Sequence, residues 1–360
     1  MEMIDIFQRQ VSTGDNVALG REAGGEDEFA VLNAMLKKLT PYFTHPDVEE
    51  IALNRPGEVW LKRRRPKEGE DIWHAIVDPS LTFEYLERVF KVVANTNNQQ
   101  FGGGKNQNPM VYSALPGGHR FSGAMYKNIV YSEMKATGGV ALCIRQAPRD
   151  DSVITYDAYG LVEGVRVTAP ERFKDRKDES HDDLDKLKRA INEGSHLIVS
   201  GATSTGKTTL LNRIIAELDR KLRVITVEDT RELIVPHPNR FHIVLSRTEQ
   251  MNNFDDGAAI NLLTRMTPDI IICGEVSVEN AKTIWELTGS GHGNMMTTIH
   301  AEDPEQALRT FIQRMQHTDK TINAEETLKE MKKRFTVVQI VRDPSTGRRR
   351  ITAIETFPGA

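Results

Sequence analysis

The chain is poor in cysteine and has no long apolar run. Its only two cysteines, Cys143 and Cys273, lie far apart inside apolar stretches, so we expect buried free thiols and no disulfide framework. No apolar run approaches the length of a membrane span. The N-terminus is polar and acidic and carries no secretory signal. Together these features predict a cytoplasmic protein.

An excess of positive charge is also absent. The net charge is −4, so no general electrostatic attraction to nucleic acid or anionic lipid follows. Aromatic residues make up only 6%, which argues against a nucleic-acid channel lined with stacking side chains. The 39% of apolar and 27% of charged residues are normal for a globular protein, and 360 residues favour two domains.

A glycine-containing loop is the most informative stretch that is present. Residues 201–208, GATSTGKT, fit the pattern of two glycines five apart followed by Lys and Ser/Thr. Glycine permits the backbone angles that curl successive N–H groups around phosphate oxygens. Lys207 brings a positive charge to the outer phosphates, and the Thr208 hydroxyl can ligate Mg²⁺. The alternative is a turn rich in Gly and Thr that holds no ligand.

The residues around this loop support phosphate binding. The apolar run 196–200 predicts a buried parallel strand before the loop. After the loop, apolar residues recur at helical spacing, namely Leu210, Leu211, Ile214, Ile215 and Leu218. A strand, a loop and a helix in this order suit the motif, because the N-terminus of a helix attracts anions.

The sequence divides into four segments. Residues 1–27 are expected to be a flexible N-terminus, 28–150 a mixed α/β domain, 151–190 a charged linker that turns into a helix, and 191–360 a second domain. In the first domain we expect a helix from about Phe29, a hairpin around Pro56-Gly57, a helix over 83–93, and strands over 110–115, 120–125 and 140–145.

The second domain alternates strands and helices. Strands are predicted at 196–200, 222–228, 241–245, 269–273, 336–342 and 349–357. One helix over 281–288 stops at Gly289, and another starts at Asp303 with Pro304 in its first position. This alternation predicts a mostly parallel, doubly wound sheet whose ligand lies at the carboxyl ends of its strands.

Carboxylates and histidines follow the predicted strands. Glu228 and Asp229 end one strand and Glu275 another, so one carboxylate can hold the Mg²⁺ shell while another orients a water. His292 and His300 lie within and after a glycine-rich turn, where an imidazole can sense a γ-phosphate. The alternatives are solvated strand ends and polar loop residues.

The order of these motifs resembles one family, the traffic ATPases of type IV secretion and conjugation systems, which are relatives of the type II secretion and type IV pilus ATPases. The motifs are the phosphate loop, then VED at 227–229, PDIIICGE at 268–275, GH at 291–292 and TTIH at 297–300. Further similar segments are 50–59, 115–120, 143–145 and the C-terminal strands with Arg348 and Arg349. The resemblance covers about residues 28–357.

The resemblance implies an N-terminal α/β sheet domain (PAS-like), a C-terminal RecA-like P-loop domain, and ATP with Mg²⁺ bound between them in a hexameric ring. Glu228 then resembles the catalytic carboxylate, Glu275 the metal-side carboxylate after the Walker B strand, and His300 a member of the histidine box. The implied nucleotide-binding residues are Gly201, Ala202, Thr203, Ser204, Thr205, Gly206, Lys207, Thr208, Thr209, Arg120 and Arg145. Thr208 and Glu275 are the implied metal ligands.

Three arginines match this family, and one serine departs from it. Arg120 and Arg145 would reach from the first domain to the phosphates, a task that suits a permanently charged, planar guanidinium. Arg265 resembles a family arginine to which the sequence assigns no role. Ser277 stands where the family usually has arginine, so an arginine role at that point is not expected here.

The function implied is an ATPase that drives pilus biogenesis and the translocation of DNA or protein, at the cytoplasmic face of the bacterial inner membrane. Its partners would be other copies of the chain, secretion-channel components and a coupling ATPase. The alternatives are a RecA-like nucleic-acid motor, a type II secretion or type IV pilus ATPase, and a scaffold that binds ATP with little turnover. A basic cluster after the first hairpin, Lys62, Arg63, Arg64, Arg65 and Lys67, is either a contact for phospholipid or nucleic acid, or a solvated hairpin end.

Overall fold

The computed structural model contains two compact units. The described residues are 29–64, 66, 70–104, 107–131, 138–147, 183–228, 231–245, 256–289, 291, 294–342 and 349–357. The first unit holds the described residues through 147 together with those of 239–266, and the second unit holds the others. The segment 239–266, which we expected in the second domain, thus groups with the first unit. The limits of the four predicted segments stay predictions.

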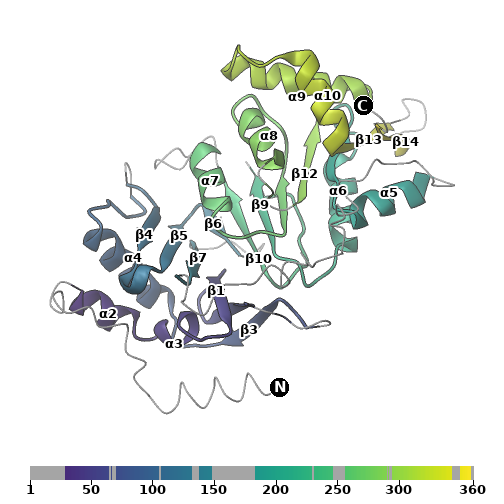
Figure 1. The fold of residues 1–360 in the computed structure, drawn as a ribbon. Helices are drawn as coiled ribbons and strands as arrows, with labels where there is room; N and C mark the ends of the chain where they lie inside the picture. Colours follow the sequence, from purple (N-terminus) through teal and green to yellow (C-terminus); the bar gives the residue numbers. More distant parts are fainter. Residues whose placement is uncertain are drawn as a thin grey trace, which may run out of the picture. The chain divides into compact units, whose positions relative to one another are not determined.

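An antiparallel sheet of six strands forms the centre of the first unit (Figure 1). Its order is β3-β2-β1-β7-β5-β4. The pair β1 and β2 is the predicted hairpin, and Gly57 at its turn has a φ of 79°, which favours glycine. The strands are β1 (Val48–Leu53), β2 (Glu58–Arg63), β3 (Trp73–Val77), β4 (Met110–Ala114), β5 (Arg120–Tyr126) and β7 (Gly139–Arg145).

Helix α4 (Phe83–Thr96) packs against β4 and β7 of this sheet. Its apolar side, which includes Leu86, Val89 and Phe90, is fully buried. Thr82 caps the helix by accepting a hydrogen bond from the Tyr85 N–H at 3.2 Å. The other helices before β7 are α2 (Ala30–Leu36), α3 (Thr40–Phe43) and the 3₁₀ helix η1 (Pro116–Gly118).

A distant part of the sequence completes the first unit. Strand β10 (Arg240–Val244) pairs antiparallel with the short strand β6 (Ile129–Val130). Just before β10, the Asn239 side chain accepts a hydrogen bond from Asn54 Nδ2 at 2.9 Å. Helix α7 (Asp256–Leu263) packs near β5. These non-local contacts explain why 239–266 groups with the first unit.

A mostly parallel sheet forms the second unit and confirms the predicted architecture (Figure 1). Within this unit the order is β14-β13-β8-β12-β11-β9, and only β14 runs antiparallel to its neighbour. The central strand β12 was not predicted. The strands are β8 (His196–Ser200), β9 (Val224–Glu228), β11 (Ile270–Cys273), β12 (Asn294–Ile299), β13 (Phe335–Arg342) and β14 (Arg349–Thr356).

Two helices of the second unit begin at side-chain caps. Asp303 caps α9 by accepting from the Gln306 N–H at 2.8 Å, as predicted, and Asn323 caps α10 in the same way. The helices are α5 (Asp183–Asn192), α6 (Lys207–Glu217), α8 (Ala281–Gly289), α9 (Pro304–Thr318) and α10 (Ala324–Arg334). Among the helices in the described part of the chain, none has the length and apolar composition to cross a membrane.

Candidate active site

The phosphate loop connects strand β8 to helix α6, as the sequence predicts. Gly201 has no room for a side chain, because a Cβ there would lie 2.4 Å from the Ile340 carbonyl oxygen of β13. Its N–H donates to the Ile299 carbonyl oxygen of β12 at 3.3 Å. Gly206 precedes α6 with a φ of 94°, a conformation that strains any L side chain. Both glycines are therefore required by the loop geometry.

The crest of the loop is exposed, and its base is closed by Thr205. Ala202, Thr203 and Ser204 are exposed, and Ser204 adopts a left-handed φ of 61°, which is uncommon for a residue other than glycine. The Thr205 hydroxyl and N–H both donate to the Ala202 carbonyl oxygen, at 2.8 and 3.4 Å. The first turn of α6, from Lys207, leaves N–H groups without acceptors inside the helix. A loop with this shape is suited to phosphate oxygens.

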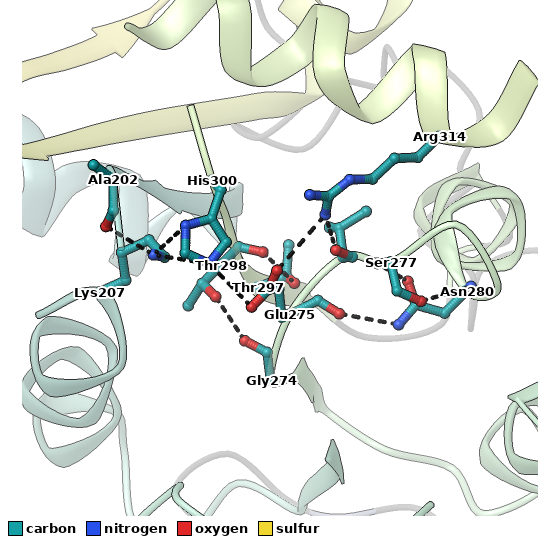
Figure 2. A network of polar contacts seen from close by, with 11 residues as sticks. Ala202, Lys207, Gly274, Glu275, Ser277, Asn280, Thr297, Thr298, His300 and Arg314 are labelled. Atoms are coloured by element: carbon teal, nitrogen blue, oxygen red, sulfur yellow. Dashed lines mark hydrogen bonds and ion pairs between the residues drawn. The ribbon is translucent and has the colours of Figure 1, made fainter. Parts of the chain in front are cut away.

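The Lys207 side chain lies folded against this loop and against His300 (Figure 2). Its Nζ donates to the Ala202 carbonyl oxygen at 3.1 Å and lies 3.1 Å from His300 Nδ1. Burial lowers the pKa of Lys207, and the nearby Glu275 carboxylate acts in the opposite direction. The ammonium group is thus largely removed from water, and in the described part of the chain no carboxylate forms an ion pair with it, so an anion beside it would be bound favourably.

His300 and Glu275 meet at the carboxyl ends of two adjacent parallel strands (Figure 2). His300 follows β12, and Glu275 follows β11. His300 Nε2 lies 3.4 Å from Glu275 Oε2. The Glu275 side chain is 48% exposed, so it remains accessible to a ligand. The structure therefore brings together Lys207, His300 and Glu275, three of the predicted site residues.

Arg314 and Asn280 also belong to this cluster, and sequence reasoning missed both (Figure 2). Arg314 on α9 lies 3.8 Å from Glu275 Oε1 and donates to the Val276 carbonyl oxygen. Asn280 donates to the Glu275 carbonyl oxygen at 3.0 Å and accepts from the Ser277 N–H at 2.7 Å. The Arg314 guanidinium therefore approaches Glu275 from α9. In the family that the sequence resembles, an arginine usually stands at the position of Ser277. No motif marks Arg314, because its contact depends on tertiary folding.

Glu228 ends β9 beside Gly274, the residue before Glu275. Its side chain is only 2% exposed, and its Oε1 accepts from the N–H groups of Glu232 and Leu233 at 2.8 and 2.7 Å. Its Oε2 accepts from the Thr226 hydroxyl at 2.9 Å and pairs with Arg231. The carboxylate is thus fully engaged by neighbouring residues of its own chain, and its catalytic role stays a prediction.

Arg120 and Arg145 lie side by side in the first unit. The register of β5 and β7 pairs the two residues directly, and both are exposed. Arg145 forms an ion pair with Glu49 at 2.9 Å. Their predicted reach to the phosphates stays a prediction.

Two members of the basic cluster after the hairpin pair with carboxylates of the first unit. Its described members contact Glu49, Glu70 and Gln146, with Lys62 to Glu49 at 3.7 Å, Arg63 to Glu70 at 3.5 Å and Arg64 to Gln146 Oε1 at 2.7 Å. A solvated hairpin end and a contact for lipid or nucleic acid both stay predictions. Arg65 and Lys67 lie outside the described residues.

The predicted metal ligands are oxygen donors near the loop. Thr208 is half-buried in the first turn of α6, next to the exposed Thr209, and Glu275 is open to solvent. Both donor types suit Mg²⁺, which keeps several waters and binds few protein oxygens. Within the described ranges, no group of three or more His, Cys, Asp or Glu side chains could hold a metal ion by itself. Asp229, His292 and Arg348 lie outside those ranges.

The fold and the loop together define the class of protein. A parallel sheet whose strand β8 leads through a glycine-bounded phosphate loop into a helix is the architecture of P-loop nucleotide-binding domains. Residues 165–341 match the family described as Type II/IV secretion system protein.

Named relatives carry the same assignment over most of the chain. The chain is 27% identical to the type IV secretion system protein PtlH homolog of Bordetella bronchiseptica, over 91% of this chain and 96% of the relative. It is 29% identical to the type IV secretion system protein VirB11 of Brucella suis, over 76% and 74%. The crystal structure of the VirB11 ATPase from the Brucella suis type IV secretion system, in complex with sulphate, shares the fold with a TM-score of 0.75, 24% identity and coverage of 91% and 95%. The predicted resemblance to type IV secretion ATPases is confirmed.

Proposed function

We propose that this chain is an Mg²⁺-dependent ATP hydrolase that works as a hexameric ring in a bacterial type IV secretion or conjugation system. The observation that carries the proposal is the convergence of Lys207, His300 and Glu275 on the phosphate loop. The resemblance to type IV secretion ATPases supports the same activity.

Binding of the nucleotide would change the partners of Lys207. Its ammonium group now donates to a neutral carbonyl oxygen and contacts an imidazole. A triphosphate in the loop would offer anionic oxygens instead, and hydrogen bonds between charged groups are stronger than neutral ones. Lys207 would therefore turn from His300 to the outer phosphates. This leaves His300 free to respond to the γ-phosphate and to pair with Glu275.

Hydrolysis needs an oriented water and compensation of phosphate charge. Thr208 and Glu275 would hold the Mg²⁺ shell, and the bound ion supplies charge neutralisation at the phosphates. Glu228 is the predicted carboxylate for the water, and it would first have to exchange Arg231 and its backbone donors for that water. Arg314 keeps the Glu275 carboxylate oriented.

The first unit would sense the triphosphate through Arg120 and Arg145. Both residues are exposed on paired strands, and guanidinium groups suit phosphate oxygens. Loss of the γ-phosphate would weaken their grip and allow the domains to open. In a ring, this motion would be passed between subunits to drive pilus biogenesis and translocation at the cytoplasmic face of the inner membrane. Channel components and a coupling ATPase would be the partners there.

Phosphate release and native mass test the proposal together. The purified full chain, with ATP and Mg²⁺, should release phosphate, and native mass spectrometry with an ATP analogue should find six copies. Lys207→Ala should lose the activity, whereas the control Arg213→Ala, on the exposed side of α6, should keep it. Equal phosphate release by Lys207→Ala and the parent would disprove the assignment of the site. Strong stimulation by single-stranded DNA would favour the nucleic-acid motor instead.

A further inference from the structure

An arginine of the C-terminal hairpin lies directly against the phosphate loop. Arg349 is the first residue of β14, and it is exposed. A Cβ on Gly206 would lie 2.9 Å from Arg349 Cδ, 3.1 Å from its Nη1 and 3.2 Å from its Cζ. The guanidinium group therefore occupies the space beside Gly206, at the point where helix α6 begins.

Two strands of the parallel sheet hold Arg349 in this place. Strand β13 runs beside β8, with Gln339 paired to Ser200 immediately before the loop. The next residue of β13, Ile340, approaches Gly201 through its carbonyl oxygen. Strand β14 then pairs back onto β13, with Arg349 opposite Arg342. Both sides of this pairing are within the second unit, so the position of Arg349 follows from the sheet itself.

Arg349 lies close to other positive charges. In the described part of the chain, no carboxylate forms an ion pair with Arg349, and its cross-strand neighbour, Arg342, has the same charge. Like charges directly opposite one another on a sheet are unfavourable. The N-terminus of α6 adds a partial positive charge, and Lys207 in its first turn adds a full one. The N-terminus of α6, Lys207 and Arg349 thus bring positive charge to one loop, which suits a ligand with several negative charges.

We infer that Arg349 binds the phosphate chain of the nucleotide, as a second cationic side chain of the loop beside Lys207. This inference rests on the proposed function. A guanidinium group stays charged and presents two parallel N–H donors to phosphate oxygens, which a lysine cannot do. Because Arg349 touches the loop at Gly206, where the phosphates are held, its ligand is the phosphate chain and not the base. The ligands are nucleoside diphosphates and triphosphates. Inorganic triphosphate contains the same phosphate chain and should therefore bind as well.

Calorimetric binding of ADP and of inorganic triphosphate to the full chain tests this assignment. Arg349→Gln should weaken both ligands about tenfold, the usual effect of losing one charged hydrogen-bonding partner. Arg350→Gln is the matched control, since it removes the same charge from the next position, on the opposite face of β14. It should bind both ligands like the parent. Arg349→Lys should recover part of the lost affinity, because it restores the charge without the planar fork.

The outcomes separate this inference from the proposed function. If the parent binds neither ligand, the proposed function itself is wrong. If the parent binds both and Arg349→Gln binds equally well, only the role of Arg349 is refuted. Equal losses in Arg349→Gln and Arg350→Gln would show a general charge effect, and a loss for ADP alone would show a contact with the nucleoside. Either result would overturn the assignment to the phosphate chain.

Discussion

Replacing Glu228 by glutamine would remove a buried charge. All the described contacts of this carboxylate are with other groups of the protein. One carboxylate oxygen accepts from the N–H groups of Glu232 and Leu233, and the other contacts the Thr226 hydroxyl and the Arg231 guanidinium. Glutamine keeps the shape and one acceptor oxygen. Its amide NH₂ group, however, would face either the guanidinium group or the backbone N–H donors, and both arrangements are repulsive.

The expected cost follows from these contacts. Removing one partner of a buried ion pair costs about 3–5 kcal/mol, and a hydrogen bond to a charged group contributes about 1.5–3 kcal/mol. Arg231 keeps 19% of its side chain exposed and can regain some hydration, which lowers the cost. We therefore expect Glu228→Gln to lose about 2–4 kcal/mol of unfolding free energy, or roughly 5–15 °C in Tm.

Thermal unfolding followed by circular dichroism, without nucleotide, measures this loss, and Glu275→Gln is the matched control. Glu275 is 48% exposed and its ion pairs are 3.4 and 3.8 Å long, so its replacement should change the unfolding free energy by less than about 1 kcal/mol. Both variants should lose phosphate release. The reasoning is refuted if Glu228→Gln unfolds together with the parent, or if Glu275→Gln is the less stable variant.

Three further variants probe other parts of the account. Gly201→Ala should weaken nucleotide binding and cost about 1–3 kcal/mol of stability, because its Cβ would lie 2.4 Å from a backbone oxygen of β13; calorimetry and melting curves that match the parent would contradict this. Asp303→Ala should lower the unfolding free energy by about 1 kcal/mol, because α9 loses its cap. An unchanged midpoint in a denaturant titration would contradict this contribution of the cap. Arg120→Ala combined with Arg145→Ala should leave the fold intact and reduce the compaction that an ATP analogue causes in X-ray scattering; nucleotide-independent scattering of the parent would argue against the switch.

Local patterns were sufficient to predict much of the second unit. Strand β8, the phosphate loop and helix α6 follow from an apolar run, two glycines and a helical repeat of apolar residues. The Asp303-Pro304 cap is equally local. For the same reason the sequence identified Lys207, Glu275 and His300 by motif, and the structure brings their side chains together.

Features that depend on tertiary context were missed. Strand β12 contains Thr297 and Thr298, whose polar side chains are typical of a loop. Both residues are buried, and the Thr298 hydroxyl donates to the Gly274 carbonyl oxygen at 2.8 Å. Helix α10 is highly charged and buries only Leu328 and Met331, so its apolar stripe is too short to recognise. No sequence pattern groups 239–266 with the first unit, because the pairing of β10 with β6 joins residues about a hundred positions apart. The approach of Arg314 to Glu275 is likewise non-local.

A structure of the full chain with a non-hydrolysable ATP analogue and Mg²⁺ would show whether the loop after β8 holds the phosphates. We expect phosphates in the loop after β8, with Lys207 Nζ donating hydrogen bonds to the outer phosphates and its present 3.1 Å contact with His300 broken. Phosphates bound elsewhere, with Lys207 still resting on His300, would contradict it.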